Sequence, residues 1–238
     1  MKIVILGASG GIGNAFVQAY ANQADTANHE IVATYHHHRP ELTHPNVSLY
    51  QADITDEPQV QQLAAQLDEV DMLINAVGML HTADFGPEKS TRDLNSAQFI
   101  ESMRINSLPT LLLAKHFAKR FRHRRPAIFA TVSARVGSIE ENYLGGWYSY
   151  RASKAALNQS LKTLSIEWRR NLKNVCVAAL HPGTTDTSLS KPFQANVPAA
   201  QLFAPQQSVE YMIKNVIEQL TPAQSGRFWS FDGTHLPW

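Results

Sequence analysis

Short apolar runs recur along this chain, and none shows the alternation of polar and apolar residues that a half-exposed strand would carry. Continuous apolar runs of this length are typical of parallel strands buried on both faces. Between the runs, apolar residues repeat at helical spacing, as at Ile12, Ala15, Phe16 and Ala19. Strands that alternate with helices predict an α/β fold, a doubly wound (Rossmann) sheet that is mostly parallel and has helices on both faces. Seven strands are expected, at residues 2–6, 31–35, 47–51, 72–76, 128–132, 175–180 and 227–231.

The composition limits the partners of the chain. Its 238 residues show no internal repeat or shift in composition, so we expect one domain over residues 1–238. The formal net charge of +1 lacks the basic excess that draws proteins to nucleic acid. No run approaches the roughly 18 apolar residues of a membrane span. Cys176 is the single cysteine, which excludes an intrachain disulfide and fits a cytoplasmic setting. We therefore expect a small-molecule partner, with neither nucleic acid nor membrane.

Glycines cluster directly after the first expected strand and open the first expected helix, in the stretch GASGGIG at residues 7–13. A tight turn needs residues without Cβ, and a pyrophosphate must approach the backbone closely. Its charge is stabilised by the unpaired amides at a helix N-terminus. The turn therefore predicts a dinucleotide site, with contacts from Gly7, Ser9, Gly11, Ile12 and Gly13.

The end of the second expected strand meets the adenosine ribose in such a fold, and no carboxylate stands there to accept the ribose hydroxyls of NAD. His36 and Arg39 can instead pair with a 2′-phosphate, which favours NADP as the cofactor and leaves NAD possible. A solvated turn explains the histidines about as well. A metal site is not expected, because adjacent side chains diverge.

Asp53 and Ile54 follow the third expected strand. They can contact adenine through the aspartate carboxylate and the backbone. Taken alone, Asp53 is more simply a helix-capping or turn residue.

Tyr150 and Lys154 lie four residues apart at the start of an expected helix, so both side chains project from one helix face. A tyrosine has a pKa of about 10, and it can act as a base near neutrality only if that pKa falls by about three units. A nearby ammonium, together with an oxidised nicotinamide, can lower the pKa by that amount in a partly desolvated site. Taken alone, the pair is more often structural.

Other motifs of the chain favour a functional role for the Tyr150 and Lys154 pair. Several motifs of this chain have the order and spacing that one family shows. They are the glycines of residues 7–13, Asp53, the stretch Asn75-Ala76-Val77-Gly78, Asn106, Ser133, the Tyr150 and Lys154 pair and Pro182-Gly183. Over essentially its whole length the chain resembles the short-chain dehydrogenase/reductase family. The stretch from Ser133 to Ile139 and the ending through Trp238 resemble more narrowly the branch of sniffer-type carbonyl reductases and C-factor signalling proteins.

The resemblance implies a catalytic tetrad of Asn106, Ser133, Tyr150 and Lys154. Tyr150 would exchange a proton with the substrate oxygen, Ser133 would hydrogen-bond that oxygen, and Lys154 would lower the tyrosine pKa and hold the nicotinamide ribose. Asn106, beside a helix break at Pro109, would position a water in a relay to Lys154. Further cofactor contacts are implied at Asn75, Ala76, Val77, Pro182, Gly183, Thr184 and Thr187.

The gap from Ser133 to Tyr150 is longer than the family norm, so Ser138 is an alternative for the serine. Ser133 is preferred because it ends a strand, from which its side chain can reach the cofactor cleft.

Two segments, residues 81–96 and 184–205, lack strand or helix patterns and are expected to form loops at the rim of the sheet. Residues 184–205 are the candidate substrate lid, with a surface excursion without a role as the alternative. Apolar candidates for the pocket wall are Leu144, Trp147, Leu189, Phe193 and Phe203.

Two functions therefore remain open. The first is hydride transfer between a nicotinamide cofactor and a carbonyl or alcohol, by a homodimer or homotetramer as the family resemblance suggests. The second is a dinucleotide-binding signalling or regulatory protein with little turnover. The Tyr150 and Lys154 pair favours the enzyme, because a binding module needs no matched acid and activator.

Overall fold

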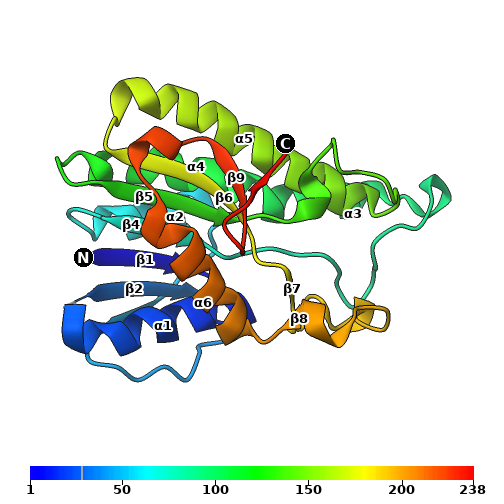
Figure 1. Ribbon diagram of the computed structural model, residues 1–238, viewed down its shortest axis with the longest axis horizontal. Coiled ribbons are helices and arrows are strands. Elements are labelled where there is room, and N and C mark those ends of the chain that lie inside the picture. Colours follow the sequence, from blue (N-terminus) through cyan, green and yellow to red (C-terminus); the bar gives the residue numbers. More distant parts are fainter. Residues whose placement is uncertain (28) are drawn as a thin grey trace.

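The computed structural model describes residues 1–27 and 29–238. Its centre is a sheet with the strand order β10-β9-β6-β5-β4-β1-β2-β3, parallel except for the pairing of β10 with β9. Figure 1 shows this sheet between layers of helices. The strands are β1 (Lys2–Leu6), β2 (Glu30–Tyr35), β3 (Val47–Gln51), β4 (Met72–Asn75), β5 (Ala127–Val132), β6 (Val175–His181), β9 (Arg227–Ser230) and β10 (His235–Leu236).

The predicted doubly wound sheet is confirmed, but seven strands was one too few. All seven predicted runs form strands, and β10 is added where the chain turns back at Gly233 and pairs His235 with Trp229. A two-residue strand has no periodicity of its own, because only its partner defines it.

The sheet buries both of its faces. Alternate residues of β1 point to opposite sides, so Val4 and Leu6 join one apolar core while Ile3 and Ile5 join the other. The first core receives α2 (Glu57–Ala65), α4 (Leu108–Phe117) and α5 (Tyr148–Asn171), and the second receives α1 (Gly11–Ala27) and α6 (Pro205–Asn215). Cys176 is fully buried in the second core, and burial raises the pKa of its thiol to about 12.

The winding places a crevice beside β1. The chain runs from β1 to β2 and β3 on one side and returns to β4, β5 and β6 on the other. In the register, Leu6 lies between Thr34 and Asn75, so the carboxyl ends of three strands meet there. Parallel sheets bind ligands outside such a reversal of strand order.

The helix break expected at Pro109 is present. α3 (Ser96–Asn106) ends at Asn106, and α4 begins at Leu108 with the proline in its first turn. Proline has no backbone N–H, and its ring would clash with the carbonyl four residues earlier in a continuous helix. The break leaves Asn106 at a helix end.

The two segments expected as loops differ from one another. Residues 81–95 are irregular apart from one 3₁₀ turn at Thr91–Asp93, and Ser96 already belongs to α3. Residues 184–205 are more regular than expected, because β7 (Thr184–Thr185) and β8 (Leu202–Phe203) pair in a second small sheet. Figure 1 shows this part beside α6, away from the main sheet. The other 3₁₀ turns are Ala118–Phe121, Arg135–Gly137, Lys191–Phe193, Ala199–Gln201, Ile217–Gln219 and Pro222–Gln224.

Among residues 1–27 and 29–238, no helix has the length and apolar character needed to cross a membrane.

Candidate active site

A cavity of about 700 Å³ opens at the carboxyl ends of the strands. Residues that follow β1, β4, β5 and β6 line it, and so do residues of α5 and of the segment 184–205. Every apolar wall residue predicted from the sequence, Leu144, Trp147, Leu189, Phe193 and Phe203, lines this cavity. It is also lined by half of the expected site residues: Ile12, Ala76, Val77, Ser133, Tyr150, Lys154, Pro182, Gly183, Thr184 and Thr187.

The glycine turn has the shape that a close-lying ligand needs. Gly7 has a φ of +87°, and a Cβ on Gly13 would stand 2.1 Å from the carbonyl oxygen of Gly7. A Cβ on Gly11 would stand 2.6 Å from Thr187 Cγ2, so the segment 184–205 reaches over the turn. The backbone N–H groups of Gly11, Ile12 and Gly13 have no hydrogen-bond partner within residues 1–27 and 29–238. These amides fit the pyrophosphate of a dinucleotide.

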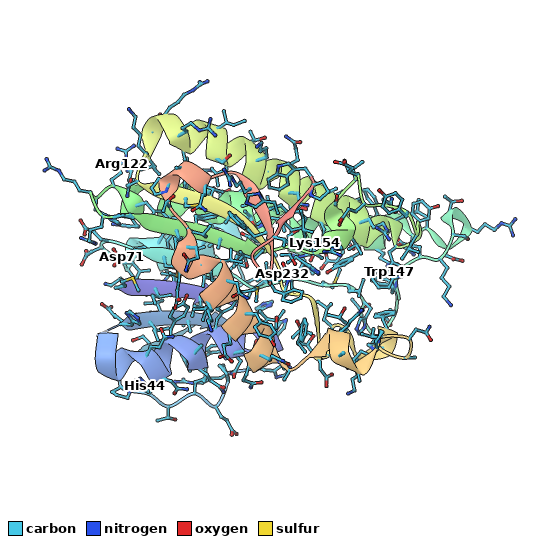
Figure 2. All side chains as sticks on the ribbon, viewed as in Figure 1. His44, Asp71, Arg122, Trp147, Lys154 and Asp232 are labelled. Carbon is cyan, nitrogen blue, oxygen red and sulfur yellow. The ribbon has the colours of Figure 1, made fainter. Side chains whose placement is uncertain are left out.

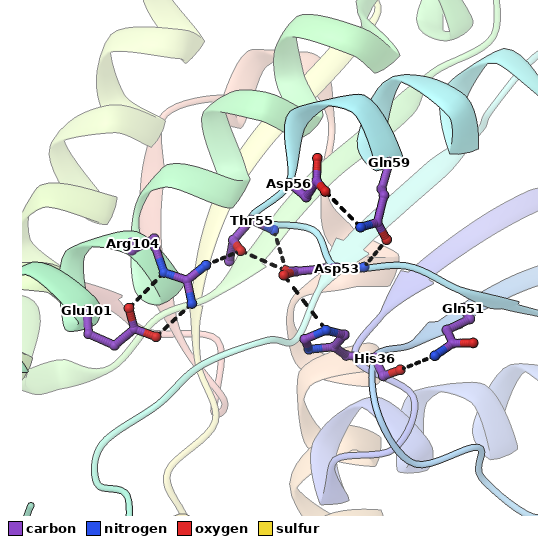
Figure 3. Close-up of polar contacts among 8 residues, drawn as sticks. All are labelled: His36, Gln51, Asp53, Thr55, Asp56, Gln59, Glu101 and Arg104. Atoms are coloured by element: carbon purple, nitrogen blue, oxygen red, sulfur yellow. Dashed lines mark hydrogen bonds and ion pairs between the residues drawn. The ribbon is translucent and has the colours of Figure 1, made fainter.

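A polar network surrounds Asp53 beyond the end of β2 (Figure 3). Its carboxylate accepts hydrogen bonds from the backbone N–H of Thr55 at 2.9 Å and from the Thr55 hydroxyl at 2.7 Å. Its own N–H donates to Gln59 Oε1 at 2.9 Å. Partial burial alone would raise the pKa of Asp53, but the bonds from Thr55 and the positive charges nearby hold it below its ordinary value. Asp53 therefore has the bonds of a turn residue.

The residues expected at the adenosine differ in their surroundings. His36 is exposed, and its Nε2 lies 3.8 Å from the second carboxylate oxygen of Asp53. Arg39 is also exposed and makes no hydrogen bond or ion pair in the part of the chain that the structure describes. The Ile54 side chain packs in the first apolar core. The cofactor roles of these residues remain predictions.

Tyr150 and Lys154 lie side by side on successive turns of α5, both less than a tenth exposed. The Lys154 ammonium lies 5.9 Å from the centre of the Tyr150 ring and donates to the carbonyl of Val132 at 3.1 Å. Burial lowers the pKa of Lys154 to about 8, because an ammonium loses its hydration there.

Burial by itself raises the pKa of the Tyr150 phenol above its ordinary value. The lowering expected from Lys154 together with an oxidised nicotinamide remains a prediction. A phenolate is poorly solvated in this wall, and the ammonium is bonded to Val132 rather than to the hydroxyl. The sequence predicts the spacing of Tyr150 and Lys154 along the helix, but it does not predict how deeply the two side chains are buried.

Asn106 lies behind the cavity and is held by several hydrogen bonds. Its Oδ1 accepts from the N–H of Met79 at 2.7 Å, and its Nδ2 donates to the Met79 carbonyl and to Ser153 Oγ at 2.8 and 2.9 Å. A Cβ on Gly78 would lie 3.3 Å from Lys154 Nζ and 3.5 Å from Asn106 Oδ1. Asn106 therefore fixes the segment after β4 beside the lysine, and its expected part in a water relay remains a prediction.

The structure distinguishes the two candidate serines. Ser133 directly follows β5 and lines the cavity, and its hydroxyl donates to Asn158 Oδ1 at 2.6 Å. Ser138 is absent from the lining of this cavity. Its hydroxyl donates to the carbonyl of Trp238 at 3.3 Å and accepts from the N–H of Glu141 at 3.2 Å. Ser133 is thus the serine whose position suits contact with a substrate.

Aromatic rings connect the segment 184–205 to Tyr150. The Trp147 ring lies 6.2 Å from that of Tyr150 and 5.2 Å from that of Phe193, which in turn lies 5.6 Å from the His81 ring. In Figure 2, Trp147 appears between α5 and the orange segment, and Lys154 appears nearer the strand ends. These contacts support the expectation that the segment covers the reacting groups.

The family model for short chain dehydrogenases matches residues 1–198. The chain belongs to the short-chain dehydrogenase family. This short-chain dehydrogenase is 36% identical over 186 residues, 78% of each chain, to 1-hydroxy-2-glutathionyl-2-methyl-3-butene dehydrogenase of Rhodococcus sp. (strain AD45). It is 34% identical over 169 residues to C-signal of Myxococcus xanthus, covering 71% of this chain and 93% of that one. It is therefore an oxidoreductase by family.

Solved structures confirm the fold of this short-chain dehydrogenase. NADPH-bound carbonyl reductase from chicken fatty liver superimposes with a TM-score of 0.83 at 24% identity, over 100% of this chain and 94% of that one. The carbonyl reductase Sniffer of D. melanogaster gives a TM-score of 0.82 at 22% identity, over 100% and 99%.

Sequence reasoning missed one residue that positions the site, Glu88 in the irregular segment 81–96. Its side chain is buried, and its carboxylate accepts hydrogen bonds from the N–H of Ser149 at 3.1 Å and from the Ser149 hydroxyl. Its carbonyl accepts from the N–H of Trp147 at 2.5 Å. Trp147 stands at the N-cap of α5 with a φ of 53° and provides no side-chain cap. Glu88 therefore caps the helix that carries Tyr150 and Lys154.

Replacing Glu88 with Gln should destabilise this short-chain dehydrogenase. The amide retains the shape but weakens the bonds to Ser149, and we expect the free energy of unfolding to fall by about 1–3 kcal/mol. Urea unfolding followed by circular dichroism measures this, with the exposed Glu140→Gln as the matched control. Equal midpoints for the two variants would contradict the capping role.

Proposed function

We propose that this short-chain dehydrogenase reduces a carbonyl compound to an alcohol with NADPH, through Tyr150 as the proton donor. One observation carries the proposal. Tyr150 and Lys154 stand buried on one face of α5, in the wall of the same cavity that Ile12 of the glycine turn lines. A dinucleotide on that turn and a substrate at Tyr150 would therefore share one cavity.

The environment of Tyr150 suits donation of a proton. Because burial raises the pKa of the phenol, it keeps its proton at neutral pH and can give it to an oxygen that is becoming an alkoxide. Ser133 would donate a second hydrogen bond to that oxygen. The nicotinamide, when bound, supplies the hydride that the carbonyl carbon receives.

Lys154 would hold the ribose beside the nicotinamide and favour loss of the Tyr150 proton once the reaction begins. With a pKa of about 8 it is an ammonium at neutral pH. Thr184 and Thr187, after the Pro182-Gly183 turn, would bind the carboxamide of the nicotinamide. Both lie in the cavity wall, and Thr187 lies against Gly11.

NADP is proposed over NAD for two reasons. His36 and Arg39 are exposed at the end of β2, where a 2′-phosphate would lie, and the Asp53 carboxylate beside His36 accepts hydrogen bonds from Thr55. In addition, a structural neighbour from Burkholderia multivorans is described with bound NADP, as the chicken enzyme is with NADPH. Asp53 and Ile54 would meet adenine through their backbone, with Asn75, Ala76 and Val77 across the crevice.

Purified protein mixed with NADPH and a panel of aldehydes, ketones and quinones tests the proposal. We expect loss of absorbance at 340 nm with at least one compound, and a kcat/KM at least about tenfold higher with NADPH than with NADH. Tight binding of NADPH without any turnover across the panel would overturn the reductase and support a binding or signalling protein.

The pH dependence of the reduction rate should follow the protonation state of Lys154. Its ammonium loses its proton near pH 8, whereas the Tyr150 phenol stays protonated well above that pH. We expect kcat/KM to be level up to about pH 8 and then to fall about tenfold per pH unit. A Lys154→Arg variant, whose cation does not titrate, should lose this alkaline limb even if its rate is lower. A profile that rises between pH 8 and 9 would contradict the assignment.

We also propose assembly as a homodimer or homotetramer through α3, α4 and α5. Exposed apolar side chains on these helices, Ile100, Leu111 and Ile166, support this.

A further inference from the structure

The hydroxyl of Ser133 is bonded to a residue behind the cavity. Its Oγ lies 2.6 Å from Oδ1 of Asn158, and both side chains are about 2% exposed. Asn158 follows Lys154 by four residues on α5, so Tyr150, Lys154 and Asn158 form one stripe along the helix. The stripe places the asparagine next to the proposed machinery, although it does not line the cavity.

The hydrogen bond from Ser133 to Asn158 uses the proton that Ser133 would need for a substrate. A serine hydroxyl has one proton, and here it is donated to the Asn158 carbonyl oxygen. That proton cannot at the same time be donated to a substrate oxygen. In this arrangement Ser133 can only accept, so the role proposed for it requires a rearrangement.

The Asn158 side chain has the group that such a rearrangement needs. Its Nδ2 is buried and has no hydrogen-bond partner in the part of the chain that the structure describes. A buried amide donor without a partner has lost its bonds to water and gained none in return, so it is stabilised by finding an acceptor. Turning the amide over would bring Nδ2 to Ser133 Oγ, which would accept from it through a lone pair and direct its own proton into the cavity.

We propose that Asn158 is a positioning residue for Ser133, and that the orientation of its amide decides whether the serine proton is held in the core or directed to the substrate. With Oδ1 toward the serine, the proton is held. With Nδ2 toward the serine, the hydroxyl donates to the carbonyl oxygen of the substrate. This inference rests on the proposed function.

Two substitutions separate this role from simple packing. Asn158→Asp has the same shape and keeps only acceptor oxygens, so it would hold the serine proton permanently. Asn158→Leu has a similar volume and leaves the hydroxyl free to turn. We expect kcat to fall about 10- to 100-fold in the Asp variant and less in the Leu variant, with the KM for NADPH unchanged. A merely structural bond predicts the reverse order, because aspartate preserves it and leucine removes it.

The same substitutions in a Ser133→Ala background complete the test. Because alanine has no proton to direct, neither change should then alter kcat by more than about twofold. Circular dichroism checks folding, and if the Asp variant does not fold, the cycle of Asn158→Leu with Ser133→Ala decides. The proposal is supported if Asn158→Leu lowers kcat several-fold when Ser133 is present and leaves kcat unchanged in the Ser133→Ala background.

Three results would overturn the inference. The first is an Asp variant with wild-type kcat, and the second is a lower kcat for the Leu variant than for the Asp variant. The third is a loss of equal size with and without Ser133. A fully active Ser133→Ala protein would instead remove the serine from the proposed function, and the inference with it.

Discussion

Replacement of Tyr150 by Phe is expected to lower kcat for carbonyl reduction by about 10²- to 10⁴-fold, the usual contribution of a positioned acid. The phenol is the proposed proton source, and burial keeps it protonated at neutral pH. Its hydroxyl makes no hydrogen bond within residues 1–27 and 29–238, so its removal should leave the fold and the Kd for NADPH nearly unchanged. Steady-state kinetics and fluorescence titration with NADPH measure the two quantities.

Tyr148→Phe is the matched control for this variant. Tyr148 stands on the same helix two residues earlier, is 42% exposed and is absent from the cavity wall. We expect its kcat to stay within about twofold of the wild type. Equal activity of the two variants would show that the proton comes from another group.

Gly13→Ala is expected to weaken NADPH binding by about 10- to 100-fold. A Cβ there would lie 2.1 Å from the carbonyl oxygen of Gly7 and 2.6 Å from its carbonyl carbon, so the backbone of the turn must move. Overpacking of this kind costs about 1–3 kcal/mol, and each 1.4 kcal/mol changes an affinity tenfold. The movement would also displace the unpaired amides of α1 that are proposed to bind the pyrophosphate.

Gly10→Ala is its control in the same turn. A Cβ on Gly10 would meet only the Gly7 oxygen, at an ordinary distance of 3.4 Å. Isothermal titration calorimetry should therefore give a Kd close to that of the wild type for Gly10→Ala and a much weaker one for Gly13→Ala. Similar Kd values for the two proteins would place the cofactor away from the turn.

The main fold could be predicted because its strands, apart from the edge strands β3 and β10, are buried on both faces. A run such as residues 175–180 is apolar at every position, and this pattern depends on no distant partner. The strands that the sequence did not reveal, β7, β8 and β10, have two residues each. Such strands exist through pairing with another segment, as Thr184 pairs with Leu202.

The site could be predicted only where its residues follow strand ends or share a helix turn. Ser133 directly follows β5, and Tyr150 and Lys154 share a face of α5, so local spacing was enough to place them. Glu88 is hydrogen-bonded to a residue 61 positions away, and Ser133 is hydrogen-bonded to one 25 positions away. Neither contact produces a pattern in the nearby sequence. The effect of burial on the Tyr150 pKa could not be predicted either, because that burial follows from the finished fold.

A crystal structure with NADP⁺ and a product alcohol would test the central claim most directly. We predict the pyrophosphate on the amides of residues 11–13, and the alcohol oxygen about 3 Å from the Tyr150 hydroxyl, with the nicotinamide alongside. A cofactor bound elsewhere, or a Tyr150 hydroxyl directed away from both ligands, would contradict it.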